Sequence, residues 1–75
     1  MPSLDQIPVG TRGVILSITG EDVIAQRLME MGVIDGEPFH LLRTAPLGDP
    51  LDVEIHGYRL SLRKTEASRV QVQIS

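Results

Sequence analysis

The feature that most constrains the fold is the stretch LDVEIHGYRLSL at 51–62, where apolar and polar residues alternate on both sides of a His-Gly pair. If His56-Gly57 is a two-residue turn, the large apolar residues of both arms share one face, and Glu54 pairs with Arg59 on the other. A slip of one residue would break every match, so the pattern predicts a β-hairpin in a single register. Glycine at the second turn position, after a histidine that tolerates positive φ, indicates a type I′ turn. The apolar set comprises Leu51, Val53, Ile55, Tyr58, Leu60 and Leu62.

Three further strands are expected outside this hairpin. They are VGTRGVILSI near the N-terminus, EPFHLLRTA after the Asp35-Gly36 turn, and RVQVQIS at the C-terminus. In the second of these strands, Phe39 and Leu41 are expected to face inward. His40 is expected on the outer face, and a solvated surface histidine is its plainest interpretation.

One α-helix is expected between the first and second strands, over roughly residues 20–31. Thr19 can act as its N-cap. Gly32 stands where a left-handed residue ends a helix, and Val33 can then pack back on Leu28. The apolar residues at helical spacing that form the buried stripe are Ile24, Leu28 and Met31.

These elements predict one small, mainly β domain over residues 1–75. Short strands with frequent turns are typical of a closed or nearly closed five-stranded barrel, because closure removes exposed strand edges. The expected core comprises Val14, Leu16, Leu28, Phe39, Leu41, Val53, Ile55, Leu60, Leu62, Val70 and Val72.

Composition narrows the functional classes. The chain has no cysteine, which removes disulfides and cysteine-based zinc sites. A net charge of −3, with one Phe and one Tyr, argues against a nucleic-acid-binding surface. The apolar runs are too short for a membrane span, and the N-terminus lacks a signal-peptide pattern. We therefore expect a cytoplasmic domain that does not insert into the membrane.

No catalytic constellation stands out, since the chain has no phosphate-binding loop, no serine elbow and no cysteine nucleophile. We therefore do not expect an enzyme. The best metal candidate is Asp52-x-Glu54-x-His56, with three polar side chains on one strand face. Glu54 already faces Arg59, which disfavours a cation there, so a solvated, salt-bridged surface is the plainer alternative. Glu54 and His56 remain as candidate ligands for a transition metal such as Fe²⁺ or Zn²⁺, and no cofactor is assigned.

The loop APLGDP at 45–50 is the second candidate site. Pro46 and Gly48 suit a type I turn, and Pro50 holds the preceding residue extended. Asp49 is expected to bond backbone groups of its own loop. Leu47 either folds back on that loop or contacts a partner. The candidate partner-binding residues are Arg43, Pro46, Leu47, Gly48, Asp49 and Arg63.

These residues also resemble the FeoA family, the small cytoplasmic partners in bacterial ferrous iron uptake. The resemblance covers nearly the whole chain and rests on Arg27-Leu28, Met31-Gly32, Gly36, Ala45 to Pro50, Gly57-Tyr58, Leu62-Arg63 and Ala67. It implies an SH3-like barrel that acts beside FeoB, a membrane permease whose cytoplasmic part contains a G domain. No catalytic residue carries over from the family to this sequence.

The function implied by this resemblance is that of a protein-interaction module for the FeoB-type transporter, recruited to the inner face of the membrane. A rival is a stand-alone metal-binding or metal-sensing module related to the C-terminal domain of iron-dependent repressors. Another is an RNA-binding SH3-like domain, which the acidic charge and sparse aromatic residues disfavour. Self-association and the sign of any effect on transport stay open.

Overall fold

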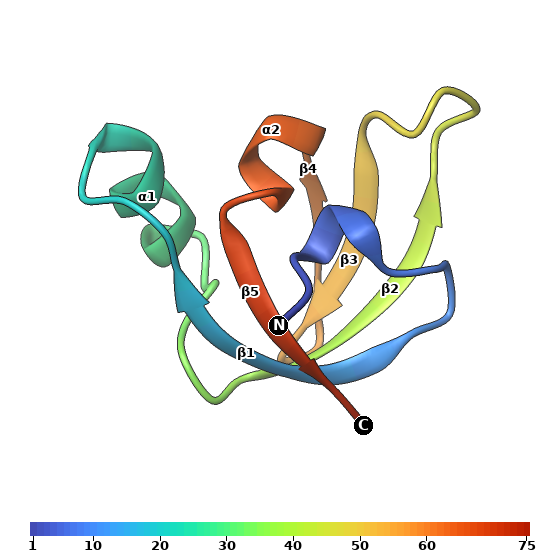
Figure 1. The fold of residues 1–75 in the computed structure, drawn as a ribbon, viewed down its shortest axis with the longest axis horizontal. Coiled ribbons are helices and arrows are strands. Elements are labelled where there is room, and N and C mark those ends of the chain that lie inside the picture. The colour runs from blue at the N-terminus through green and yellow to red at the C-terminus, as the bar shows by residue number, and fades with distance from the viewer.

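In the computed structural model, which describes residues 1–75, one five-stranded antiparallel sheet carries three short helical segments (Figure 1). The strands are β1 (Arg12–Ile18), β2 (Pro38–Thr44), β3 (Leu51–Ile55), β4 (Tyr58–Leu62) and β5 (Val70–Ile74). The helical segments are the 3₁₀-helix η1 (Leu4–Gln6), α1 (Val23–Glu30) between β1 and β2, and α2 (Lys64–Ala67) between β4 and β5. No helix in the structure has the length and apolar character needed to cross a lipid bilayer.

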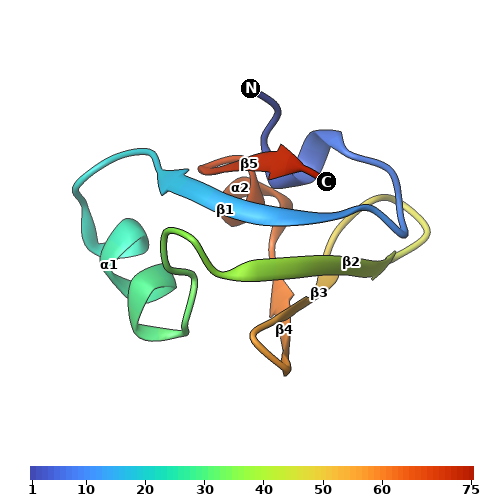
Figure 2. The same cartoon turned by 90° about the horizontal axis from the view of Figure 1, so that it is seen from below.

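The sheet is strongly curved but not closed. Its strand order is β4-β3-β2-β1-β5, so β4 and β5 are its two edges and no hydrogen-bonded ladder joins them. The expectation of a closed barrel is therefore wrong, although five antiparallel strands are present as predicted. The physical reason is that η1 and α2 lie on the concave side between the two ends of the sheet (Figures 1 and 2). Their residues Leu4 and Ala67 are completely buried. They fill the space between β4 and β5 that a closed barrel would not have.

The N-terminal segment covers the free edge of β5. Ser3 forms an isolated antiparallel bridge with Gln71. The N–H of Val72 donates to the carbonyl oxygen of Pro2 at 3.0 Å. The outer edge of β4 has no second strand beside it, so the two edges of the sheet differ.

The β3–β4 hairpin has the predicted register. Every cross-strand pair is present, from Ile55 opposite Tyr58 to Leu51 opposite Leu62. Both residues of the turn at 56–57 have positive φ, 51° for the histidine and 83° for the glycine, as a type I′ turn requires. The exposure of the side chains differs along the hairpin: Tyr58, next to the turn, is 72% exposed, whereas Leu62, at the other end of β4, is fully buried.

The placement of the helix differs from the prediction at its start. Asp22, not Thr19, is the N-cap of α1, and its carboxylate accepts a hydrogen bond from the N–H of Ala25 at 3.2 Å. The N–H of Thr19 instead donates to the carbonyl of Arg69 at 2.7 Å, which extends the sheet. The prediction also missed η1, which is too short to show a helical period. The stretch KTEAS at 64–68, which reads as a short turn or helical bend, contains α2.

The end of α1 has the predicted geometry. Gly32 has φ of 103°, and its N–H donates to the carbonyl of Met29 at 3.0 Å. The N–H of Val33 donates to the carbonyl of Leu28 at 3.0 Å, which completes a Schellman motif. Val33 is fully buried, so this turn also anchors the helix to the core.

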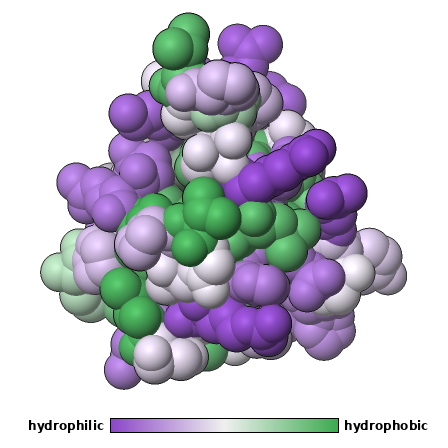
Figure 3. Space-filling view, turned by 90° about the vertical axis from the view of Figure 1, so that its right-hand side faces the viewer, coloured by the Kyte–Doolittle hydropathy of each residue, from purple (hydrophilic) through white to green (hydrophobic).

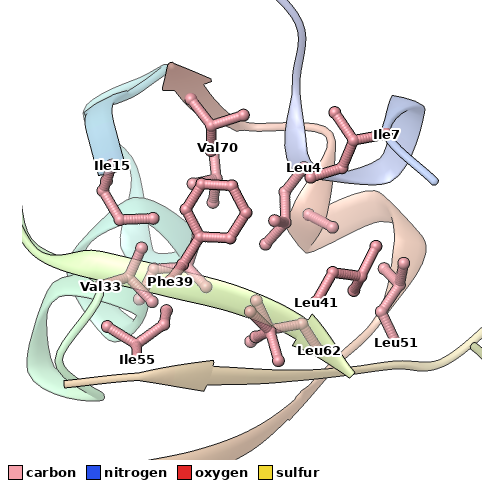
Figure 4. Close-up of a cluster of buried hydrophobic side chains, with 14 residues drawn as sticks. Leu4, Ile7, Ile15, Val33, Phe39, Leu41, Leu51, Ile55, Leu62 and Val70 are labelled. Atoms are coloured by element: carbon pink, nitrogen blue, oxygen red, sulfur yellow. The ribbon is translucent and has the colours of Figure 1, made fainter. Parts of the chain in front are cut away.

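The core fills the concave side of the sheet as one cluster of 14 buried side chains (Figure 4). The predicted members that are buried are Leu28, Phe39, Leu41, Val53, Ile55, Leu62, Val70 and Val72. Leu60 is only partly buried and packs against the cluster. The buried apolar residues that the prediction missed are Leu4, Ile7, Ile15, Ala25, Val33, Leu51 and Ala67.

Strand β1 turns the opposite face to the core from the one predicted. Ile15 is 1% exposed, whereas Val14 and Leu16 are half-buried, so the two predicted core positions are wrong. Three consecutive apolar residues give no alternation from which to choose a face. A register shift between Ile15 and Ser17 in the pairing with β5 also breaks the simple period.

Candidate interaction surface

The loop between β2 and β3 is closed by its own hydrogen bonds. The N–H of Gly48 donates to the carbonyl of Ala45 at 2.7 Å, which closes the predicted turn. The N–H of Ala45 donates to the carbonyl of Pro50 at 3.0 Å, which closes the base of the loop. Gly48 has φ of 83°, a conformation that favours glycine. These bonds hold the residues at 45–50 in a compact projection from the end of the sheet (Figure 1).

Asp49 bonds outside its own loop, so the expectation for this residue is wrong. Its Oδ1 accepts a hydrogen bond from the backbone N–H of Lys64 at 3.0 Å. Lys64 is the first residue of α2, and the β3–β4 hairpin brings it back to the loop. A local turn pattern cannot reveal a partner that lies 15 residues further along the chain. Asp49 therefore tethers the loop to the junction of β4 and α2.

Leu47 does not fold back on the loop. It is 94% exposed, the largest exposed fraction among the large apolar side chains. The space-filling view, in which the right-hand side of Figure 1 faces the reader, shows an apolar protrusion at the upper end of the molecule, where the loop lies (Figure 3). The loop thus presents an apolar tip on a hydrogen-bonded base.

Two arginines lie at the base of the loop and line separate hollows beside Pro50. Nε of Arg43 donates to Oδ2 of Asp52 at 2.8 Å, and this guanidinium holds the pKa of Asp52 below its usual range. Arg63 forms no ion pair and lines a hollow with Asp49 and Pro50. Arg43 lines a second hollow, which also includes Pro50. The six predicted partner-binding residues therefore lie around one loop and its base.

The predicted metal candidates have different partners. Nδ1 of His56 lies 2.8 Å from Oε2 of Glu37, a residue that the strand pattern did not connect with it. Glu54 is opposite Arg59 in the hairpin, and Asp52 binds the arginine described above. No group of three or more His, Asp or Glu side chains is arranged to hold a metal ion.

Sequence reasoning missed a hollow of about 670 Å³ between α1 and the β4–α2 junction. Ile24, Arg27 and Met31 line it from the helix. Ser61 and Arg63 line it from the other side. No sequence pattern connects these two groups, because only the fold brings them together.

Sequence comparison places the chain in a family. The FeoA domain profile matches residues 3–74. A fusion of Fe(2+) transport protein A with the Fe(2+) transporter FeoB, from Porphyromonas gingivalis, is 32% identical over 71 residues. That match covers 95% of this chain and 8% of the fusion protein, so the chain corresponds to a small part of that relative.

Solved structures agree in fold. The FeoA protein of Chlorobium tepidum has a TM-score of 0.87 at 36% identity, over 96% of this chain and 69% of that one. The FeoA of Stenotrophomonas maltophilia, complexed with zinc and described as a procaryotic SH3 domain protein, has a TM-score of 0.83 at 35% identity, over 97% and 91%. A manganese-dependent transcriptional repressor has a TM-score of 0.90 at 17% identity, over 99% and 36%, and shares the fold alone. The chain therefore belongs to the FeoA domain family, whose fold is SH3-like and whose members are linked to ferrous iron transport.

Proposed function

We propose that this protein is a non-catalytic accessory module of ferrous iron uptake, and that it binds the cytoplasmic region of a FeoB-type transporter through the loop at 45–50. The observation that carries the proposal is the exposure of Leu47, 94%, at the tip of a hydrogen-bonded loop. A loop backbone held in place before binding loses little conformational entropy when it docks, and an exposed apolar side chain gains from leaving water.

The tether from Asp49 supports this role. Its hydrogen bond to the N–H of Lys64 fixes the loop against α2, while Pro46 and Pro50 restrict the backbone on either side of the tip. A loop on a rigid scaffold is a common location for binding residues. The loop is therefore arranged as a preformed contact rather than as a flexible connection.

The fusion protein of Porphyromonas gingivalis supports the choice of partner. In that protein a transport protein A segment and a FeoB transporter form one chain, which keeps the two parts at a high effective concentration. In the proposed complex our chain acts in the cytoplasm and is recruited to the inner face of the membrane by its partner. Arg43 and Arg63, beside the loop base, can then meet acidic groups on the transporter.

The test is a titration against the purified cytoplasmic region of the cognate transporter, with thermal melts in parallel. Leu47→Asp should weaken binding by roughly tenfold or more, the loss expected for a binding hot spot. The melting temperature should stay unchanged, because Leu47 has no place in the buried cluster. Val9→Asp is the matched control, since Val9 is 54% exposed in a different loop. Wild-type affinity in Leu47→Asp, or a loss that accompanies unfolding, would contradict the proposed surface.

A metal-binding role is the second candidate, and the zinc complex of the Stenotrophomonas maltophilia FeoA favours it. In our chain His56 and Glu37 supply one nitrogen and one carboxylate, fewer than the four ligands of a structural zinc site. Calorimetric titration with Zn²⁺ and Fe²⁺ tests this role. Stoichiometric, submicromolar binding that His56→Ala abolishes would establish it, and binding unaffected by His56→Ala and Glu54→Ala would exclude the two candidate ligands His56 and Glu54.

A further inference from the structure

The edge of β4 is open to solvent along its length. Because a two-residue turn makes Ile55 and Tyr58 a hydrogen-bonded pair, every second residue of β4 bonds to β3. The N–H and C=O groups of Arg59 and Ser61 therefore point away from β3, where β4 has no neighbour. These groups make no hydrogen bond to a loop or turn, and both residues are exposed.

A hollow lies next to this open edge. In both ribbon views α1 stands on the side of β4 away from β3 (Figures 1 and 2). The hollow between them is lined by Ile24, Arg27 and Met31 on the helix side, and by Ser61 and Arg63 on the strand side. An added strand would lie about 4.8 Å from β4, at the edge where Ser61 and Arg63 also line the hollow.

Two arginines without an ion pair line this hollow. Arg27 and Arg63 form no ion pair, whereas Arg43 and Arg69 each bind an aspartate. Arg59, further along β4, also forms no ion pair and lies opposite Glu54 in the hairpin. The one acid of the hollow, Glu66, accepts a hydrogen bond from the backbone N–H of Arg63 at 2.8 Å. In a chain of net charge −3 this is a local excess of positive charge, which is complementary to an acidic ligand.

The two faces of β4 specify different neighbours for an added strand. Arg59, Ser61 and, by alternation, Arg63 belong to the outer face, while Tyr58 and Leu60 belong to the inner face. Residues of an added strand also alternate between faces, so acidic residues would lie beside the arginines and apolar residues beside Tyr58 and Leu60. We propose that the edge of β4 binds, by strand addition, an extended segment of a partner protein in which acidic and apolar residues alternate.

A second copy of this chain is a poorer occupant. Antiparallel pairing of two β4 edges about Ser61 would place Arg59 of one copy opposite Arg63 of the other. Like charges directly opposite each other destabilise a strand pair. The inference goes beyond the proposed function, because it rests on the edge and its charges and holds for any partner with such a segment.

The experiment uses the whole protein, ¹⁵N-labelled, and two capped peptides, Ac-TEVEVEVT-NH2 and Ac-TKVKVKVT-NH2. The acidic peptide should give saturable shifts of the Arg59 and Ser61 amides and slow their hydrogen exchange by roughly tenfold, as new hydrogen bonds form. The lysine peptide should give neither effect. Equal binding of both peptides, or no response at these two amides, would overturn the proposal and leave the arginines as charges that only keep the edge from aggregating.

Two matched pairs of variants complete the test. Ser61→Pro removes the outward N–H, at an edge position where proline is tolerated, whereas Ser61→Ala keeps it. The acidic peptide should bind Ser61→Ala and not Ser61→Pro. Arg63→Glu should weaken this binding by about tenfold or more, by analogy with close charge pairs, and Arg12→Glu on the exposed end of β1 should not. If both Ser61→Pro and Arg63→Glu bind the acidic peptide like wild type, the proposal is contradicted. Thermal melts show whether either variant is poorly folded, and the other variant then decides the outcome.

The same peptide assay separates this inference from the proposed function. Leu47→Asp should bind the acidic peptide like wild type while it loses the transporter region. Loss of peptide binding in Leu47→Asp at an unchanged melting temperature would show that the peptide uses the loop, and would overturn the assignment to the β4 edge.

Discussion

Asp22 connects α1 to the sheet through a single carboxylate oxygen. Its Oδ1 accepts from the N–H of Ala25 at 3.2 Å and from Nη1 of Arg69 at 2.5 Å. The hydrogen bond from Arg69 is the main cause that lowers the pKa of Asp22, and the bond from Ala25 adds to it. Arg69 immediately precedes β5, so one side chain both caps the helix and fixes it to the sheet edge.

This arrangement predicts a specific dependence of stability on pH. Because the folded pKa of Asp22 is lowered, its charge stabilises the fold fully above the ordinary value of about 3.9. That contribution is lost as pH falls through the lowered pKa. Wild type and Asp22→Asn, which keeps a capping side chain, should therefore differ by a constant free energy of unfolding between about pH 5 and pH 7. The difference should shrink below about pH 3.9 in urea unfolding series.

Glu21→Gln is the matched control, because Glu21 is a neighbouring exposed acid that forms no ion pair with an arginine, lysine or histidine. Its difference from wild type should stay small across this range. A difference between wild type and Asp22→Asn that persists unchanged at low pH would show that the carboxylate charge is not what stabilises α1.

At the scale of the element, the β3–β4 hairpin shows how strand pairing and burial separate. Leu60 and Leu62 occupy the same face of β4, yet Leu62 is fully buried and Leu60 is half-buried. The difference arises because the end of β4 near Leu62 lies over the core, while the other end extends toward the turn at 56–57, where Tyr58 is exposed. Strand alternation specifies the face and not the depth.

The hairpin therefore predicts unequal costs for two similar truncations. Leu62→Ala should destabilise the protein by about 2–5 kcal/mol, because it leaves a cavity in the closed cluster. Leu60→Ala should cost roughly 1–2 kcal/mol, since part of that side chain is already in water. Urea unfolding with a common m-value measures both, and equal costs would show that Leu60 is as deeply packed as Leu62.

At the scale of the whole molecule, one edge of the open sheet is covered by the N-terminal segment and the other is uncovered. The edge of β5 is covered by Pro2 and Ser3, and Leu4 and Ile7 from the same segment enter the core. The edge of β4 is covered by nothing and carries Arg59 next to unpaired backbone groups. An uncovered edge that is charged resists aggregation and still offers hydrogen bonds to a chosen strand.

Removal of the N-terminal cover should affect stability and association together. Leu4→Ala should cost about 2–5 kcal/mol, because Leu4 is fully buried between α2 and the sheet. Deletion of residues 1–7 should in addition expose the β5 edge and produce concentration-dependent self-association in sedimentation velocity. Met1→Ala is the control, since Met1 is 88% exposed. A monomeric, wild-type-stable deletion would show that η1 is dispensable.

Local sequence patterns were enough to predict the hairpin, its turn and the end of α1. The register of β3 and β4 follows from alternation on both sides of a His-Gly pair, and the end of the helix follows from Gly32 and Val33. In each case the residues that interact are neighbours in the chain, so their spacing alone carries the information. The same reasoning identified the turn at 45–48, whereas the family followed from the resemblance of the sequence to FeoA proteins, which the domain profile confirms.

Tertiary contacts decided the remaining features, because the residues involved lie far apart in sequence. The face of β1, the N-cap at Asp22 and the open sheet depend on contacts with β5, η1 and α2. Asp49 finds its partner on α2 through the hairpin, and Arg27 and Arg63 meet at one hollow only after the sheet has curved. A period in the sequence records which way a side chain points, but it does not record what the folded chain places beside it.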